Sequence, residues 1–147
     1  MAVHVEVALV GVKQGGVLSP LMFSVYIDNL LTLLSNARVG CYLGDVLCGA
    51  LEYADDIVLL APTLSALRVL LRECEVFGHE FNVLFNSSKS KAIVMRSPQS
   101  NGPDPVINFM SGHIEVVKCD KHLGHLFGNV SQDNIITNVI NDFQAKV

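Results

Sequence analysis

The stretch LEYADDIVLLAP, residues 51–62, sets two adjacent carboxylates, Asp55 and Asp56, in the middle of an apolar run. Two neighbouring carboxylates that were buried without a partner would be costly, so this point must reach either solvent or a cation. The apolar flanks and the Asp residues at the break predict a β-hairpin with its turn at residues 54–56. The pair is then either a solvated turn or a site for a hard cation such as Mg²⁺, which takes oxygen ligands.

The segments around this hairpin predict an α+β fold with antiparallel hairpins. VHVEVALVGV, residues 3–12, alternates like a strand, and Ser19-Pro20 is typical of the start of a helix, here over residues 20–35. That helix is so apolar that we expect it to be mostly buried. A second, amphipathic helix begins at Pro62-Thr63. Its apolar stripe consists of Leu64, Leu67, Leu70, Leu71, Cys74 and Phe77.

The rest of the chain predicts further strands and one terminal helix. Gly44-Asp45 is a turn candidate between CYL and VLC, and FNVLFN and KAIVM read as two strands on either side of a polar stretch. A loop is expected over residues 97–105. PVINFM, HIEVVK and KHLGHLFG follow as strands, and residues 131–147 are expected to form a C-terminal helix.

Composition narrows the function classes. Half of the 147 residues are hydrophobic, which suits one domain with a real core and some apolar surface for a protein partner. The formal net charge is -4, so any contact with nucleic acid must be local. The four cysteines and five histidines lack metal-ligand spacing, and we expect His122 and His125 on a strand surface. No signal peptide or membrane span is evident, which favours the cytoplasm or nucleus.

Five segments, in order, resemble the reverse transcriptases of non-LTR (LINE-type) retrotransposons. YADD, residues 53–56, is similar to their Y-x-D-D box, and GVKQGGVLSP, residues 11–20, is similar to their G-x-R-Q-G-x-x-x-S-P segment. The helix LMFSVYIDNLL lies between the two. Asn86 and Lys89 match an N-x-x-K segment, and HLG, residues 122–124, resembles the Y-L-G of the primer grip.

The resemblance implies a polymerase palm and two-metal nucleotidyl transfer. Asp55 would be the principal Mg²⁺ ligand, with Asp56 beside it as a weaker or indirect one. An intact parent enzyme would use two Mg²⁺ ions, one to activate the primer 3′-hydroxyl and one to steady the pyrophosphate. Its partners would be an RNA template, a DNA primer and a dNTP.

The same resemblance implies roles for the neighbouring residues. Gln14 and Gly15 would lie near the template and the incoming nucleotide, Ala54 near the primer end or that nucleotide, and Lys89 near the triphosphate. Tyr53 of the box would belong to the same nucleotide- and template-binding set. His122, Leu123 and Gly124 would contact the primer. Simpler explanations stay open: a plain loop for residues 14–15, a solvated turn for Lys89, and a core position for Tyr53.

One expected element of the family pattern is missing from the sequence. Its polymerases need a further Asp on a strand upstream of the Q-G segment, yet the sole acid before Gly11 is Glu6. We therefore expect a partial palm over residues 1–130, without the fingers or the first palm strand, and the start of a connection or thumb over residues 131–147. Such a chain should be inactive alone, since two carboxylates do not fix a two-metal geometry.

The alternative function is a non-enzymatic, truncated retroelement product that acts through a protein partner. A phosphoacceptor receiver domain also uses paired acidic residues. It requires a regular alternation of parallel strands and helices, which this sequence lacks.

Overall fold

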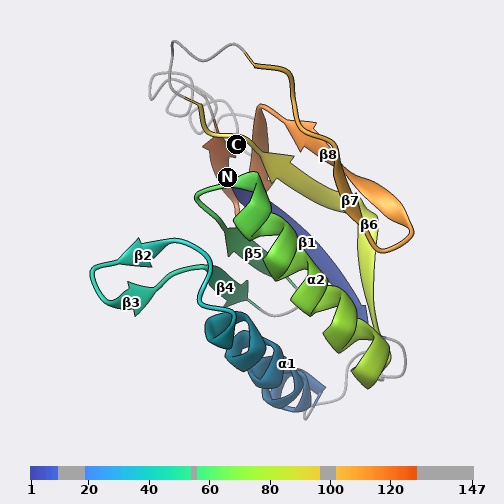
Figure 1. Ribbon diagram of the computed structural model, residues 1–147. Helices are drawn as coiled ribbons and strands as arrows, with labels where there is room; N and C mark the ends of the chain where they lie inside the picture. Colours follow the sequence, from blue (N-terminus) through green and yellow to red (C-terminus); the bar gives the residue numbers. More distant parts are fainter. Residues whose placement is uncertain (10–18, 54–55, 97–101, 129–147) are drawn as a thin grey trace, which may run out of the picture.

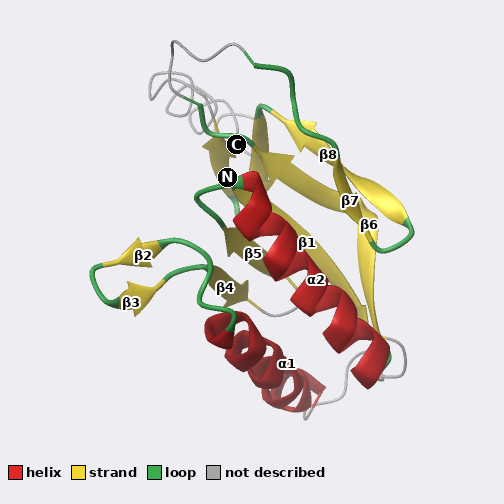
Figure 2. Cartoon of the chain, in the orientation of Figure 1, coloured by secondary structure: helices red, strands yellow, loops and turns green. Residues whose placement is uncertain are grey.

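The computed structural model describes residues 1–9, 19–53, 56–96 and 102–128, and Figures 1 and 2 show them as an α+β arrangement. Its centre is a six-stranded sheet with the order β4-β5-β1-β6-β8-β7. The strands of this sheet are β4 (Ala50–Tyr53), β5 (Asp56–Leu60), β1 (Ala2–Leu9), β6 (Val83–Ile93), β8 (Gly112–Val117) and β7 (Ile107–Phe109). Two helices, α1 (Ser19–Asn36) and α2 (Leu64–Phe81), accompany it. The predicted C-terminal helix, residues 131–147, lies outside the described residues.

Two small hairpins form separate two-stranded sheets. The first pairs β2 (Tyr42–Leu43) with β3 (Val46–Leu47), which confirms the predicted turn at Gly44-Asp45. The second pairs β9 (Cys119–His122) with β10 (His125–Gly128), so the predicted strand KHLGHLFG is a hairpin. Leu123 and Gly124 at its tip have φ of 51° and 81°. Two residues of positive φ are what a tight two-residue hairpin turn requires.

The first strand, β1, lies inside the sheet. It is antiparallel to β5, with Val5 opposite Ile57, and antiparallel to β6, with Val3 opposite Ala92. The valines and their partners are fully buried. One pair in the sheet is parallel, β6 with β8, because the chain crosses back between these two strands. The expected antiparallel α+β fold is thus confirmed for most of the sheet.

Helix α2 is formed as the sequence predicts. The Thr63 side chain accepts a hydrogen bond from the Ala66 amide at 3.1 Å, and Asn82 ends the helix in the left-handed conformation. The predicted stripe supplies its buried side chains: Leu67, Leu70, Leu71, Cys74 and Phe77. These side chains join the inward side chains of β1 and β5 in one core.

Helix α1 contradicts the expectation of a mostly buried helix. Ile27, Leu30 and Leu34 are buried, but Val25 is 61% exposed and Tyr26 is 45% exposed. The helix contacts α2 and the edge strand β4, which cover one side of it. Among the described residues of α1, these two apolar side chains therefore remain exposed.

Strand β6 corrects a second expectation. FNVLFN and KAIVM were predicted as two strands, and the structure joins them in one strand of 11 residues with an irregular register against β1. The Asn86 side-chain oxygen accepts hydrogen bonds from the Ser88 hydroxyl at 2.7 Å and the Lys89 amide at 3.2 Å. Ser90 donates to the Asn86 carbonyl at 2.8 Å. These local hydrogen bonds hold the backbone of the polar stretch where the pairing with β1 is irregular.

The two faces of the sheet differ in their cover. In Figure 1, α2 crosses the face to which Val3, Val5, Ile57 and Leu59 contribute the core. Alternation along the strands sends His4, Val58 and Leu60 to the other face, and the β9–β10 hairpin lies there. In the described part of the chain, neither helix is both long and apolar enough to cross a membrane.

Candidate functional site

The arms of the predicted hairpin around the Asp pair are confirmed. β4 and β5 are antiparallel, and Tyr53 lies opposite Asp56 at the end of the pairing that is next to residues 54–55. Ile57 and Leu59 anchor β5 in the core, while Asp56 is only half-buried. Tyr53 is 63% exposed, so a plain core position for its ring is wrong. The turn residues Ala54 and Asp55 lie outside the described part of the chain.

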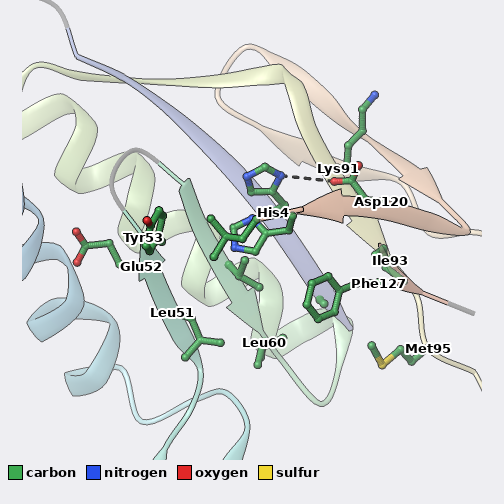
Figure 3. Close-up of a pocket in the computed structure, with 14 residues that line it drawn as sticks. His4, Leu51, Glu52, Tyr53, Leu60, Lys91, Ile93, Met95, Asp120 and Phe127 are labelled. Carbon is green, nitrogen blue, oxygen red and sulfur yellow. Dashed lines mark ion pairs between the residues drawn. The ribbon is translucent and has the colours of Figure 1, made fainter. Parts of the chain in front are cut away.

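A cavity of about 500 Å³ lies on the sheet face opposite the helices (Figure 3). Its walls come from β1, β4, β5, β6 and the β9–β10 hairpin, and most of them are apolar. The lining residues are Ala2, His4, Leu51, Glu52, Tyr53, Val58, Leu60, Lys91, Ile93, Met95, Asp120, His122, Leu123 and Phe127. An apolar cavity with a few converging polar groups is the usual form of a ligand site.

Three residues predicted from the sequence meet at this cavity. Tyr53 comes from the carboxylate box, and His122 and Leu123 come from the segment expected to contact the primer. Asp56 touches the cavity indirectly, through a bond to His4. The structure thus brings the two motifs together although about 70 positions separate them in the sequence.

His4 is the polar centre of this cavity. Its Nε2 lies 3.0 Å from Asp56 Oδ1, and its Nδ1 lies 3.5 Å from Asp120 Oδ2, the ion pair drawn as a dashed line in Figure 3. A neutral imidazole donates from one nitrogen, whereas a protonated one donates from both. The ring therefore links a β5 carboxylate to a β9 carboxylate.

His122 does not lie on an open strand surface as expected. Its ring centroid is 4.9 Å from that of His4, and its Nδ1 is buried with no hydrogen-bond partner among the described residues. One ligand atom each of His4, Asp56 and His122 lies within 4.8 Å of the others. His125, across the hairpin, is exposed as expected.

Glu52 adds a perturbed carboxyl to the cavity wall. Desolvation raises its pKa above the ordinary value of 4.5, and the negative charge of Asp28 on α1 raises it further. A carboxyl of raised pKa beside an apolar cavity is a common feature of functional sites. This pairing could not be predicted from the sequence, because Asp28 and Glu52 belong to distant segments.

The other predicted residues lie away from the cavity or outside the described residues. Lys89 is exposed in the irregular part of β6 and is not among the described residues that line the cavity. Gln14 and Gly15 lie outside the described residues. Glu6, the acid upstream of the Q-G segment, lies opposite Asp56 in the backbone register of β1 and β5.

Sequence reasoning missed His4 and Asp120. The alternation of VHVEV could have placed His4 on the face opposite Val3 and Val5. It could not have shown that β9, more than a hundred residues later, folds over that face.

Comparison with known proteins gives one family match. Residues 5–127 match the family described as "Reverse transcriptase (RNA-dependent DNA polymerase)". This range contains every predicted site residue.

Three curated relatives are polyproteins of retrotransposable elements. The chain is 44% identical over 79 residues to the "Retrovirus-related Pol polyprotein from type-2 retrotransposable element R2DM" of Drosophila melanogaster, an alignment that covers 54% of the chain. It is 30% identical over 125 residues to the Pol polyprotein of the type-1 element R2 of Popillia japonica, covering 80% of the chain. The R2 polyprotein of Nasonia vitripennis is 43% identical over 65 residues, or 44% of the chain. The alignments span 7%, 18% and 6% of these relatives, respectively.

Proposed function

The chain belongs to the reverse transcriptase family, with a domain of the non-LTR retrotransposon type, and from this we propose that it forms the palm segment of an RNA-directed DNA polymerase. In a complete enzyme this segment acts on an RNA template, a DNA primer and a dNTP. Residues 1–130 are its palm part, and residues 131–147 lead toward a connection or thumb. The enzyme works in the cytoplasm or nucleus.

The observation that carries this proposal is the meeting of two motifs at one cavity. Tyr53 and Asp56 are opposite each other in the β4–β5 register, next to residues 54–55, and the turn after His122 reaches the cavity that Tyr53 lines. A polymerase needs its metal-binding carboxylates beside the primer end, because the primer hydroxyl is the nucleophile. The arrangement of the two motifs is consistent with that requirement.

Asp55 and Asp56 are the residues that would hold Mg²⁺. Asp56 suits this role, since it offers carboxylate oxygens, is half-buried and starts a strand anchored by Ile57. His4 orients the Asp56 carboxylate through the 3.0 Å contact. Two Mg²⁺ ions bound there would activate the primer 3′-hydroxyl and neutralise the negative charge of the pyrophosphate.

The other predicted residues are assigned to substrates. Gln14, Gly15 and Ala54 contact the template, the nucleotide or the primer end, and Lys89 approaches the triphosphate. Gly124 and its neighbours in the β9–β10 turn contact the primer. By themselves, the 147 residues supply the two box carboxylates but no upstream aromatic-x-Asp segment, so we propose that this polypeptide alone does not polymerise DNA.

Primer extension on an RNA template in Mg²⁺ tests the proposal. The 147-residue chain alone should give no product. A chimera that carries residues 11–127 in the matching region of the Drosophila R2 polyprotein should extend the primer. Asp55→Asn in the chimera should lower extension by about 10³-fold, the scale of losing a preorganised electrostatic contact. Asp45→Asn, in the turn between β2 and β3, is the matched control and should leave extension unchanged.

A second candidate function is a non-enzymatic interaction module. The observation in its favour is the apolar surface at the cavity mouth, where Leu51, Leu123 and Phe127 are each about half exposed. Apolar patches of this kind mark binding sites. A folded chimera that makes no DNA would favour this function over polymerisation.

A further inference from the structure

We propose that His4, Asp56 and His122 form a binding site for a divalent transition metal ion of the zinc class. The site overlaps the Mg²⁺ pair at Asp56 but differs from it, because it adds two imidazole nitrogens and does not involve Asp55. It shares Asp56 with the polymerase proposal but does not rest on it.

The first support is the distance among the three ligand groups. One ligand atom from each residue lies within 4.8 Å of the other two, and His4 Nε2 is 3.0 Å from Asp56 Oδ1. In tetrahedral coordination at 2.0–2.1 Å, neighbouring ligand atoms are roughly 3.3 Å apart. The longest separation therefore has to shorten by roughly 1.5 Å, which rotation of one ring can achieve.

The second support is the unsatisfied nitrogen of His122. Its Nδ1 is buried and has no hydrogen-bond partner among the residues described. Buried polar atoms are normally paired, and a buried atom without a partner often marks the position of a bound water or ion. A metal ion bound to His122 Nδ1 would give this atom the partner that it otherwise lacks among the described residues.

The third support is Asp120, which lies on the far side of His4. Its Oδ2 is 3.5 Å from His4 Nδ1 (Figure 3). The other ring nitrogen, Nε2, faces Asp56. Histidines that bind metals usually donate their second ring N–H to a carboxylate, which fixes the tautomer and orients the ring. Asp120 is thus the positioning residue of the site.

The ligand chemistry selects the ion. Mg²⁺ prefers oxygen ligands, whereas two imidazoles and one carboxylate suit Zn²⁺ or Co²⁺. All three residues are half-buried, so a water molecule can take the fourth position. The ligands lie on three strands, β1, β5 and β9, of which the first two belong to the main sheet. The site would therefore fasten the β9–β10 hairpin to that sheet.

Calorimetric titration of the untagged, metal-free 147-residue chain with Zn²⁺ tests this inference. We expect one ion per chain. His122→Gln should weaken binding by more than about 100-fold, and Asp120→Asn by about 10–100-fold, the range for residues that orient a ligand. His113→Gln is the matched control, because His113 is exposed on β8 and pairs with Asn108 at 3.2 Å. It should bind Zn²⁺ like the parent chain.

A second measurement needs no variant. Co²⁺ should give the visible absorption of a tetrahedral site, and Zn²⁺ should shift the ring ¹⁵N resonances of His4 and His122 but not those of His113. The inference is wrong if Zn²⁺ does not saturate, if the rings of His4 and His122 do not respond, or if folded His122→Gln binds as before. Displacement of Zn²⁺ by an equal concentration of Mg²⁺ would also refute it. None of these results affects RNA-templated extension by the chimera, which tests the polymerase proposal separately.

Discussion

Replacing Gly78 with alanine should destabilise the protein, although alanine is the better helix former. Gly78 lies in α2 where the helix passes close to β6. A Cβ atom at this position would lie 2.8 Å from the Val83 carbonyl oxygen and 3.2 Å from Phe85 Cε2. The carbonyl is backbone, so it cannot move without shifting the start of β6.

The magnitude follows from two opposing terms. Alanine gains about 1 kcal/mol over glycine inside a helix. Overpacking a tight core costs about 1–3 kcal/mol, and contact with backbone favours the upper end of this range. The free energy of unfolding should therefore fall by about 2 kcal/mol, and Tm by about 4–8 °C for a chain of this size.

Urea unfolding followed by circular dichroism measures this change. Gly102→Ala is the matched control, because no atom lies within 4 Å of the Cβ position there. It should leave stability unchanged or raise it by up to about 1 kcal/mol. If Gly78→Ala is as stable as the parent chain, with an unchanged m-value, the close approach of α2 to β6 is not as described.

Three further predictions concern titration, reactivity and backbone strain. Desolvation and the charge of Asp28 raise the pKa of Glu52, so the folded state binds the Glu52 proton more tightly than the unfolded state does. The free energy of unfolding should therefore fall as the pH rises from 4.5 through the raised pKa. Glu52→Gln removes this titrating group and should make the free energy of unfolding depend less on pH over that range. Equal slopes in both proteins would contradict this cause. Burial raises the pKa of the Cys74 thiol to about 12, whereas Cys119 is exposed. Iodoacetamide should therefore alkylate Cys119 long before Cys74, as measured by peptide mass spectrometry. Equal labelling rates would show that Cys74 is not buried. Asn82 has a φ of 55°, so Asn82→Ala should lower the free energy of unfolding by about 1 kcal/mol, whereas Asn82→Gly should leave it nearly unchanged. Urea unfolding measures both variants, and equal effects would exclude backbone strain as the cause.

Local patterns in the sequence predicted most elements of the fold. The leucine stripe and Thr63 predicted α2, and the apolar flanks of the Asp pair predicted the β4–β5 hairpin, because these signals depend on neighbouring residues. The exposed face of α1 was not predictable. Whether Val25 is covered depends on which elements pack nearby, and periodicity does not contain that information.

The candidate site divides in the same way. Tyr53 and His122 were found as members of family motifs, whereas their common cavity depends on tertiary structure. The His4–Asp120 contact joins β1, at the start of the described chain, to β9, near its end. No spacing rule predicts such a pair, because ligand motifs in sequences work only where the ligands are close along the chain.

The central position of β1 has a consequence for how the protein is made. β1 precedes both of its partner strands in the chain, and Ala2 pairs with Leu60 on one side and Ile93 on the other. At about 5–20 residues per second, roughly 5–20 s pass on the ribosome before both partners exist. During this time an apolar strand has two unpaired edges, and non-local pairings of this kind form slowly. Chaperone demand and yield on expression should therefore depend on the speed of translation through residue 93.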